Sequence, residues 1–324
     1  MMNNNQYKAI ENIIFNCGGL SANDHALILC DVSTRQIADE FLKCAISVNP
    51  NVKLMEIPEL PNHGAEPTDQ AKEAMCRATL ILSLCKYSLA HSRARIDSAL
   101  AGARFLSLPL YDWNLLNDEC LRIDYPAQAG RVRNFADAFT AGQQIHVTTE
   151  AGTDIRLGIT GRIGNYCPGL VKVAGDLGSP PDIEANVSPI ENSAEGVVVV
   201  DGSITMPSFG LLQTPVELEV CAGKVIAFRS ANMDYVKQLN ILFGETDSLR
   251  RVVAECGVGL NPAAKLTGSM LTDEGAFGCV HFGLGSNYTV GGLNRVDFHL
   301  DFVFKDASLT VDGQQLINLG VPLL

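Results

Sequence analysis

The chain has 324 residues, of which 47% are hydrophobic and 19% are charged, and its formal net charge is −12. This composition is typical of a folded globular protein with room for two domains, and it excludes a disordered chain. The excess of negative charge argues against nucleic acid or an anionic membrane as a partner, because both require a basic patch on the protein.

Targeting signals and cysteine usage indicate the compartment. No uncharged apolar run reaches the roughly 18 residues of a membrane span, and no basic segment leads into an apolar core at the N-terminus. The ten cysteines are scattered along the chain without a C-x-x-C pair. They predict reduced core thiols in a cytoplasmic protein rather than disulfides or a zinc knuckle.

The first part of the chain alternates between short apolar runs and segments with helical spacing. Strands are expected at 25–32, 51–58, 79–85 and 104–110, and helices at 33–48, 67–78 and 91–103. This alternation predicts a doubly wound α/β domain with a mostly parallel sheet over residues 1–142. The turn after the first strand, DVSTRQ, lacks a dinucleotide-binding glycine fingerprint, so the domain is interpreted as a Rossmann-like scaffold.

The pattern changes near residues 140–146. Segments with period-two alternation and glycine turns follow at 143–162, 195–204, 215–228, 278–285, 296–304 and 307–316. A helix is expected at 231–244, and a helical turn can begin the segment 246–261. The second part, 143–324, therefore predicts a mainly antiparallel β (α+β) domain with helical insertions.

Histidines and a carboxylate gather near the C-terminus. His299 and Asp301 are two residues apart in a strand pattern, so both side chains should project from one face while Leu300 enters the core. They fit either metal ligands or a structural His–Asp hydrogen bond. His281, beside glycines that would permit a close approach, fits either a third ligand or a core histidine. Two histidines and one carboxylate can bind Fe(II) or form part of a zinc site.

Two further carboxylates are candidates. Glu255 lies among apolar residues in RVVAECGVGLNP, where burial would require a cation, an arginine or a proton. Glu184 precedes a strong strand and could equally be a solvated loop acid. Nothing in the pattern distinguishes Asp273 and Glu274 from surface residues.

A family resemblance rests on four stretches that occur in family order: PPDIEANVSPIENSAEGVVVVDGSI, VVAECGVGLNP, DEGAFGCVHFGLGSNYTVGG and FHLDF. Together they resemble the motifs of the metallo-aminopeptidases of the aminopeptidase T and leucyl aminopeptidase type. The segments HSRARIDSALAGARFLSLP and TTEAGTDIRLGITGR are also similar to that family, so the resemblance covers most of the chain.

The resemblance implies a site and a reaction. It implies two divalent metal ions, zinc, cobalt or manganese, in a cytoplasmic homodimer. Its ligand positions fall on Glu184, Glu255, His281, Tyr288, His299 and Asp301. Glu255, which usually bridges the metals, and Tyr288, which could stabilise an oxyanion, are the expected catalytic residues. The expected function is a hydrolase in which metal-activated water attacks the carbonyl of a small peptide or amide substrate.

Two alternatives stay open. The 2,5-dihydroxypyridine 5,6-dioxygenases resemble this fold and its final H-L-D, are shorter than the aminopeptidases, and use one Fe(II) to cleave an aromatic ring. In that branch a histidine stands at the position of Glu255 and none at that of His281, so this sequence has the aminopeptidase residues at both. The second alternative is a metal-stabilised homologue without catalytic activity.

Overall fold

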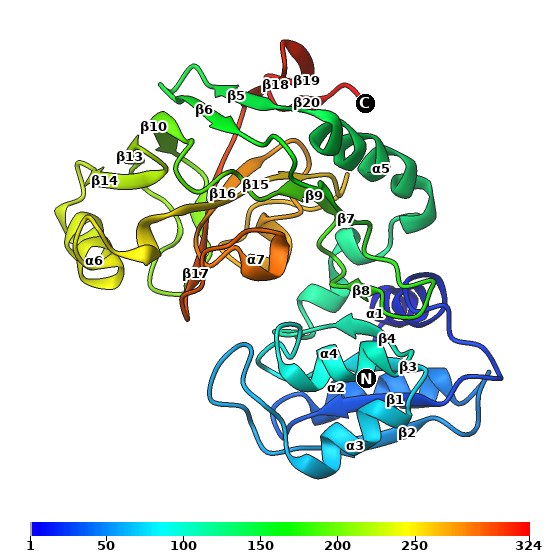
Figure 1. Cartoon of the computed structure of the whole chain (residues 1–324). Coiled ribbons are helices and arrows are strands. Elements are labelled where there is room, and N and C mark those ends of the chain that lie inside the picture. The colour runs from blue at the N-terminus through cyan, green and yellow to red at the C-terminus, as the bar shows by residue number, and fades with distance from the viewer. Residues whose placement is uncertain (1) are drawn as a thin grey trace. The chain divides into compact units, whose positions relative to one another are not determined.

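The computed structural model describes residues 2–324, which form two compact units (Figure 1). Unit 1 extends to Ala127 and includes Cys167–Pro181, whereas unit 2 consists of Gln128–Tyr166 and Asp182–Leu324. The chain therefore passes between the units three times. The simple division at residue 142 stays a prediction.

Unit 1 is built on a parallel sheet with the strand order β2-β1-β3-β4-β8. Its strands are β1 (Ala26–Cys30), β2 (Lys53–Glu56), β3 (Leu80–Ser83), β4 (Arg104–Ser107) and β8 (Leu177–Gly178). The parallel α/β sheet expected from the alternating pattern is thus confirmed. The strand β8, contributed by a distant segment, was not expected, because two residues are too short to give a period.

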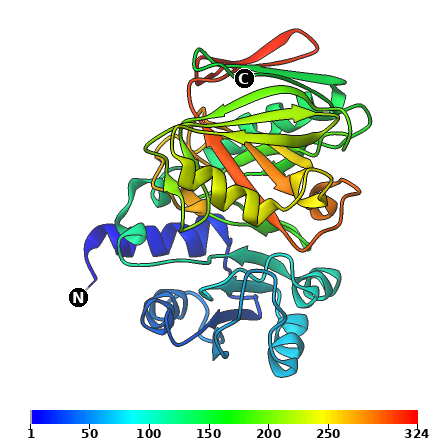
Figure 2. The same ribbon diagram turned by 90° about the vertical axis from the view of Figure 1, so that its left-hand side faces the viewer.

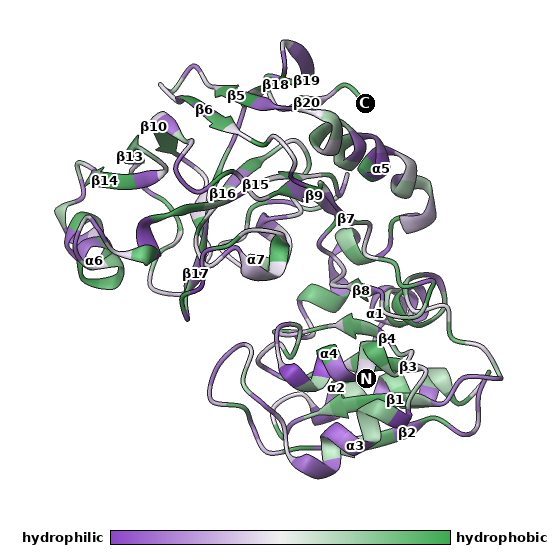
Figure 3. Ribbon diagram, viewed as in Figure 1, coloured by the Kyte–Doolittle hydropathy of each residue, from purple (hydrophilic) through white to green (hydrophobic). Residues whose placement is uncertain are grey.

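The helices of unit 1 connect these strands. They are α1 (Asn4–Glu11) with a π-helical extension (Asn12–Cys17), α2 (Arg35–Ala45), α3 (Asp69–Arg77) and α4 (Arg93–Leu100), followed by 3₁₀ turns at Leu115–Asn117 and Glu119–Leu121. Helix α1 contacts α2, and α3 contacts α4. Leu27, Ile81 and Phe105 of the sheet form one core with Met75 of α3 and Ala94 of α4, and the apolar colour of these strands is visible in Figure 3.

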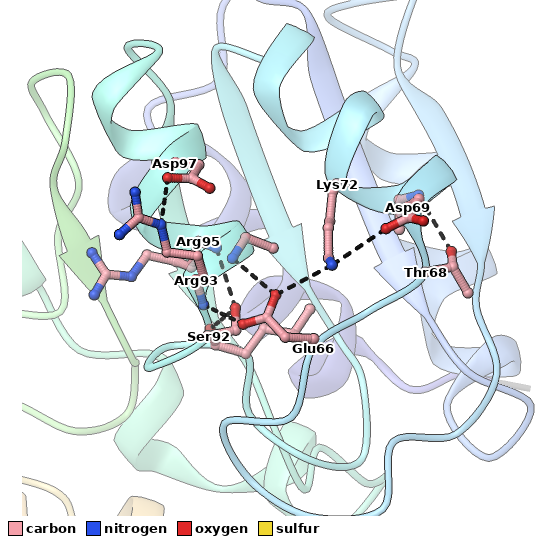
Figure 4. Close-up of polar contacts among 11 residues, drawn as sticks. Glu66, Thr68, Asp69, Lys72, Ser92, Arg93, Arg95 and Asp97 are labelled. Carbon is pink, nitrogen blue, oxygen red and sulfur yellow. Dashed lines mark hydrogen bonds and ion pairs between the residues drawn. The ribbon is translucent and has the colours of Figure 1, made fainter.

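A carboxylate closes the first turn of α4. Glu66 accepts hydrogen bonds from the backbone N–H groups of Arg93 and Ala94, and the Ser92 side chain caps Arg95 (Figure 4). Lys72 of α3 lies 3.8 Å from the same carboxylate. Because Glu66 already satisfies the positive end of the helix, no external anion is needed there. The scaffold interpretation of unit 1 stays a prediction.

Unit 2 contains two largely antiparallel sheets. The eight-stranded sheet has the order β14-β13-β10-β6-β5-β18-β19-β20 and the seven-stranded sheet the order β12-β11-β17-β16-β15-β9-β7. The first comprises β5 (Gln144–Thr148), β6 (Asp154–Gly158), β10 (Glu195–Val200), β13 (Val216–Cys221), β14 (Lys224–Arg229), β18 (Ser308–Val311), β19 (Gln314–Asn318) and β20 (Val321–Pro322). The second comprises β7 (Asn165–Cys167), β9 (Glu184–Val187), β11 (Ser203–Ile204), β12 (Gly210–Leu211), β15 (Val253–Gly259), β16 (Val280–Gly285) and β17 (His299–Phe304).

Helices are few in unit 2. They are α5 (Tyr125–Ala141), which begins in unit 1, α6 (Met233–Phe243), α7 (Met270–Asp273) and 3₁₀ turns at Leu249–Arg251 and Tyr288–Val290. Helix α6 packs on β14 and is seen lengthwise in Figure 2. None of the helices described over residues 2–324 has the length and apolar character to cross a bilayer.

The expected β pattern is confirmed in part. Strands β9 and β15 lie where the sequence predicted a loop and a segment beginning with a helical turn. The predicted strand 195–204 is two strands, β10 and β11, which belong to different sheets. The chain changes sheet at Gly202, where an added Cβ would lie 2.5 Å from the carbonyl oxygen of Val303. Only glycine permits this approach, so the residue that looked like part of a strand is the corner between two.

Candidate metal centre

Five of the six predicted ligand residues lie on one face of the seven-stranded sheet. Glu184 is on β9, Glu255 on β15, His281 on β16, and His299 and Asp301 are on β17. Their cross-strand partners are glycines: Gly259 opposite Glu184, Gly257 opposite His281, Gly283 opposite both Glu255 and Asp301, and Gly285 opposite His299. Directly opposite residues share a face of a sheet, so polar side chains alternate with glycines across this surface.

The glycines provide the space for the imidazoles. A Cβ added at Gly257 would lie 2.0 Å from Nε2 of His281, and one at Gly283 would lie 2.5 Å from Nε2 of His299. The Nε2 and Cε1 atoms of each ring therefore occupy the space over a glycine of the neighbouring strand. The sequence predicts a close approach at Gly283 and Gly285, and at Gly283 the approaching group is the ring of His299.

A β-bulge brings Glu255 to this face. Val253 pairs with Leu284 and Glu255 with Gly283, which leaves Ala254 as an extra residue on β15. In a regular strand Val253 and Glu255 would share a face. The bulge lets Val253 enter the core while Glu255 joins the histidines.

Glu255 lies between two groups of potential ligands. One group consists of Glu184, Glu255 and His281, and the other of Glu255, His299 and Asp301. The Oε1 atom of Glu255 is 3.7 Å from Nε2 of His281, and its Oε2 atom is 3.4 Å from Nε2 of His299. The two oxygens of one carboxylate thus face two different imidazoles.

Hydrogen bonds orient several members of the cluster. Nδ1 of His299 lies 2.8 Å from the carbonyl oxygen of Ser286. Because a carbonyl oxygen can only accept a hydrogen bond, Nδ1 carries the hydrogen. Nε2 of the same ring faces Oδ1 of Asp301 at 3.2 Å. The side-chain amide of Asn186 donates to Oε1 of Glu184 at 2.6 Å. Backbone carbonyl and amide partners of this kind commonly fix ligands around a metal ion.

Some buried polar atoms have no such partner. Among residues 2–324, Oε2 of Glu184 and Nδ1 of His281 are enclosed without a hydrogen bond. Oε2 of Glu184 nevertheless faces Nε2 of His281 at 3.1 Å, an ion-pair distance when the ring is protonated. Buried polar atoms without partners are rare in folded proteins. The atoms that face one another in this cluster, Nε2 of His281 and the oxygens of Glu184 and Glu255, are imidazole and carboxylate donors suited to a first-row divalent metal.

The protonation of the histidines reflects this environment. Burial lowers the pKa of both rings, but the neighbouring carboxylates raise it by more. Glu184 and Glu255 raise the pKa of His281 well above its usual range. Asp301 and Glu255 raise the pKa of His299 to about 10. His299 in turn holds the pKa of Asp301 below its usual range despite burial. Burial raises the pKa of Glu184. The cluster therefore strongly attracts positive charge.

Two carboxylates that sequence reasoning did not identify adjoin the cluster. Burial, followed by the charge of Glu184, raises the pKa of Asp182 well above its usual range, and burial with the charge of Asp301 does the same for Glu274. One oxygen of each is enclosed. The expectation that Asp273 and Glu274 are surface residues is wrong, because Asp273 is fully buried and accepts hydrogen bonds from the backbone N–H groups of Thr267 and Gly268. Their local sequence contains no periodic signal that could have revealed this.

Tyr288 lies apart from these groups. It is half exposed, and the guanidinium of Arg295 stacks on its ring at 3.4 Å from the centroid. No hydrogen bond among residues 2–324 joins its hydroxyl to the cluster. The roles expected for Tyr288 as ligand and oxyanion donor stay predictions.

The chain thus combines an α/β unit with a β unit. The buried cluster of histidines and carboxylates in the β unit has the donor set of a divalent-metal site. The family model described as 2,5-dihydroxypyridine 5,6-dioxygenase (NicX) matches residues 12–323. The chain therefore belongs to the 2,5-dihydroxypyridine 5,6-dioxygenase family.

Solved structures agree with this assignment at the level of the fold. The 2,5-dihydroxypyridine dioxygenase from Pseudomonas putida superposes with a TM-score of 0.84 and 20% identity, covering 98% of this chain and 96% of that one. AmpT from Thermus thermophilus superposes with a TM-score of 0.71 and 14% identity, covering 99% of both chains. A search of curated protein sequences finds no significant match.

The comparisons correct the expected function. The aminopeptidase-like hydrolase is wrong, because the family that matches nearly the whole chain is a dioxygenase family. The predicted relationship is confirmed in part: the branch given as the shorter relative is the one to which the chain belongs, and the fold extends to AmpT. The residue types at Glu255 and His281 favoured the aminopeptidases in the sequence. These two residues indicate which atoms can bind a metal, but they do not determine which reaction the metal supports.

Proposed function

We propose that this protein is a metal-dependent dioxygenase that opens a hydroxylated, nitrogen-containing aromatic ring. The observation that carries the proposal is the family match over residues 12–323, a span that includes every member of the polar cluster. The substrate class is a dihydroxypyridine, by analogy with the family and with the Pseudomonas putida enzyme. The reaction breaks one ring bond and adds both atoms of O2 to the product.

The cluster fits the metal that such a reaction requires. Imidazole and carboxylate donors suit ferrous iron. The oxygens of Glu184 and Glu255 lie within 3.1–3.7 Å of the imidazole nitrogens of His281 and His299, so these groups could converge on a cation. The side chains of Glu184, Glu255, His281, His299 and Asp301 would hold the divalent metal, and the two ions expected from the sequence stay a prediction. When bound, iron supplies the redox chemistry that O2 needs.

The protein's own groups prepare this site. Ser286 fixes the ring of His299 through Nδ1, and Asn186 fixes Glu184. Burial and the neighbouring carboxylates raise the pKa values of Asp182 and Glu274, which favours the neutral form of both groups and so limits the negative charge around the ligands. The homodimer and the exclusion of nucleic acid stay predictions.

Oxygen consumption tests the proposed function. The protein is reconstituted with ferrous iron without oxygen, mixed with 2,5-dihydroxypyridine, and then exposed to O2. One O2 should disappear per ring, with loss of the aromatic absorbance, and His299→Ala should abolish both. If the iron-loaded protein consumes no oxygen with any dihydroxypyridine isomer, the proposal is wrong.

A further inference from the structure

The loop that joins β16 to β17, residues 286–298, is anchored by polar contacts outside the metal cluster. We propose that Glu191 and Arg162 act as positioning residues by holding this β16–β17 loop in place. The loop in turn orients two ligands, His299 on β17 and Glu184 on β9, whose strands are not neighbours in the sheet. The inference deepens the proposed function and rests on it only for the binding of a metal ion at the cluster.

Glu191, in the segment that follows β9, is the main anchor of the loop. Its Oε1 atom accepts hydrogen bonds from the side-chain amide of Asn287 at 2.9 Å and from the backbone N–H of Leu293 at 2.6 Å. Burial raises the pKa of Glu191, but these hydrogen bonds and the charge of Arg162 lower it below its usual range. The contacts therefore favour the charged carboxylate, which is the stronger acceptor.

Arg162 lies just beyond β6 of the eight-stranded sheet and contacts both the anchor and the loop. Its Nη2 atom is 2.6 Å from Oε2 of Glu191, and its Nη1 atom donates to the carbonyl oxygen of Gly291 at 2.7 Å. The side chains of Arg162 and Glu191 are only 13% and 24% exposed. A partly enclosed guanidinium that joins a carboxylate to a backbone carbonyl fixes geometry better than an exposed ion pair does.

The β16–β17 loop is also braced internally. Asn287 is fully buried, and its Oδ1 atom accepts a hydrogen bond from the backbone N–H of Asn294 at 2.7 Å. The side chain of Asn294 donates to the carbonyl oxygens of Gly285 at 2.6 Å and Leu249 at 2.9 Å. Because these buried amides are satisfied within the loop and at its base, a displacement at Glu191 would reach the base of the loop.

The base of the loop orients His299. The carbonyl oxygen of Ser286 accepts a hydrogen bond from Nδ1 of His299 at 2.8 Å. That carbonyl belongs to the same peptide group as the backbone N–H of Asn287, which donates to the carbonyl oxygen of Asn294 at 3.2 Å. The peptide group that sets the ring of His299 is therefore covalently attached to the residue that Glu191 holds.

The middle of the loop is linked to Glu184. The side-chain amide of Asn165 on β7 donates to the carbonyl oxygen of Val290 at 3.0 Å and to Oδ1 of Asn186 at 2.7 Å. Asn186 in turn donates to Oε1 of Glu184 at 2.6 Å. One loop thus supports ligands on the two outer strands of the ligand-bearing set β17-β16-β15-β9. Loss of partners that orient ligands typically weakens metal affinity by about 10–100-fold.

Cobalt binding tests this positioning role. The full chain is titrated with Co(II) against a competing chromophoric chelator, and the visible absorption of the bound ion, which depends on its coordination geometry, is recorded. Glu191→Ala should weaken Co(II) binding by about 10–100-fold and change the absorption band. Glu191→Gln keeps the acceptor for both loop donors and should recover most of the affinity. Arg162→Lys should show an intermediate loss, because one ammonium group cannot reproduce the fork that reaches Glu191 and Gly291.

Two control variants separate positioning from stability. Val220→Ala removes buried volume from β13 in the other sheet and should lower Tm without changing the affinity or the absorption of Co(II). Glu217→Ala breaks an ion pair with Arg229 between β13 and β14 and should change neither Co(II) property.

Three outcomes would overturn the inference: wild-type affinity and absorption in Glu191→Ala, an equal loss of affinity in Val220→Ala, or no Co(II) binding by the wild-type chain. If Glu191→Ala does not fold, Arg162→Lys decides, and wild-type affinity and absorption in that variant would also overturn it. Co(II) binding does not depend on turnover. A positioning effect of Glu191 without oxygen uptake by the iron protein would therefore refute only the proposed function, and oxygen uptake with wild-type Co(II) binding in Glu191→Ala would refute only this inference.

Discussion

Gly283 offers the sharpest test of the glycine pattern on the metal-binding face. In Gly283→Ala the new Cβ would lie 2.5 Å from Nε2 of His299 and 3.0 Å from Oδ1 of Asp301, whereas ordinary contact begins at 3.4 Å. The ring must therefore move by about 0.9 Å. The backbone at Gly283 is not in the left-handed region, so alanine is conformationally acceptable and the effect is purely steric.

The magnitude follows from two sources. Overpacking of a buried site costs about 1–3 kcal/mol, which lowers Tm by about 2–12 °C for a protein unit of this size. Displacement of a ligand that Ser286 orients should weaken the affinity for the metal ion by about 10–100-fold. The assays are differential scanning calorimetry and metal titration with a competing chromophoric chelator.

The control is another glycine in unit 2. Gly130 lies in α5 with no atom within 4 Å of an added Cβ, so Gly130→Ala should leave metal affinity unchanged and stabilise the helix by about 0.5–1 kcal/mol. If Gly283→Ala bound metal as tightly as the wild type, His299 would not be a ligand in the position described.

Three further predictions concern the cluster. Asn186→Ala removes the donor to Oε1 of Glu184 and should lower the free energy of unfolding, measured by urea titration, by about 1–3 kcal/mol. Asn186→Ser should recover part of this loss. In the metal-free protein the pKa of His299 is raised from about 6.5 to about 10. The stability that its protonation contributes is therefore fully present below pH of about 6.5 and is lost as pH rises through 10. The Tm of the wild type should fall across this pH window and the Tm of His299→Gln should fall less, whereas a parallel decline in both would show that another group is responsible. Burial and the charge of Asp301 raise the pKa of Glu274 well above its usual range, which favours a protonated carboxyl that can donate a hydrogen bond. Glu274→Gln keeps a donor and should retain wild-type Tm and metal content, whereas Glu274→Leu should lower both. Equal effects of the two substitutions would contradict a donor role.

Local periodicity was sufficient for much of the fold. The apolar run of β1 and the helical spacing of α2 could both be identified in the sequence. The period-two pattern placed His299 and Asp301 on one face, and Nε2 of His299 lies 3.2 Å from Oδ1 of Asp301. Strand register was not readable, because it depends on pairing between segments distant in sequence. The convergence of Glu184 with His281 arises only when β9 and β16 pair with opposite sides of β15.

Other features of the site left no signal in the sequence. The bulge at Ala254 reverses the face on which Glu255 lies, and Asp182 and Glu274 are buried by tertiary contacts and not by any pattern of their own. The reaction was not readable for a different reason. The same imidazole and carboxylate donors bind metals that hydrolyse amides and metals that activate oxygen, so ligand identity alone does not define the chemistry.

The path of the chain through unit 1 has a consequence for synthesis on the ribosome. Strand β4 ends at Ser107, but its neighbour β8 ends at Gly178, 71 residues further on (from 107 to 178). At about 5–20 residues per second this delay lasts about 4–14 s. During that time β4 presents an unpaired edge while the strands β5 and β6 have already emerged, and an open edge is a template for incorrect pairing. Translation speed between residues 107 and 178 should therefore affect how much newly made chain folds correctly.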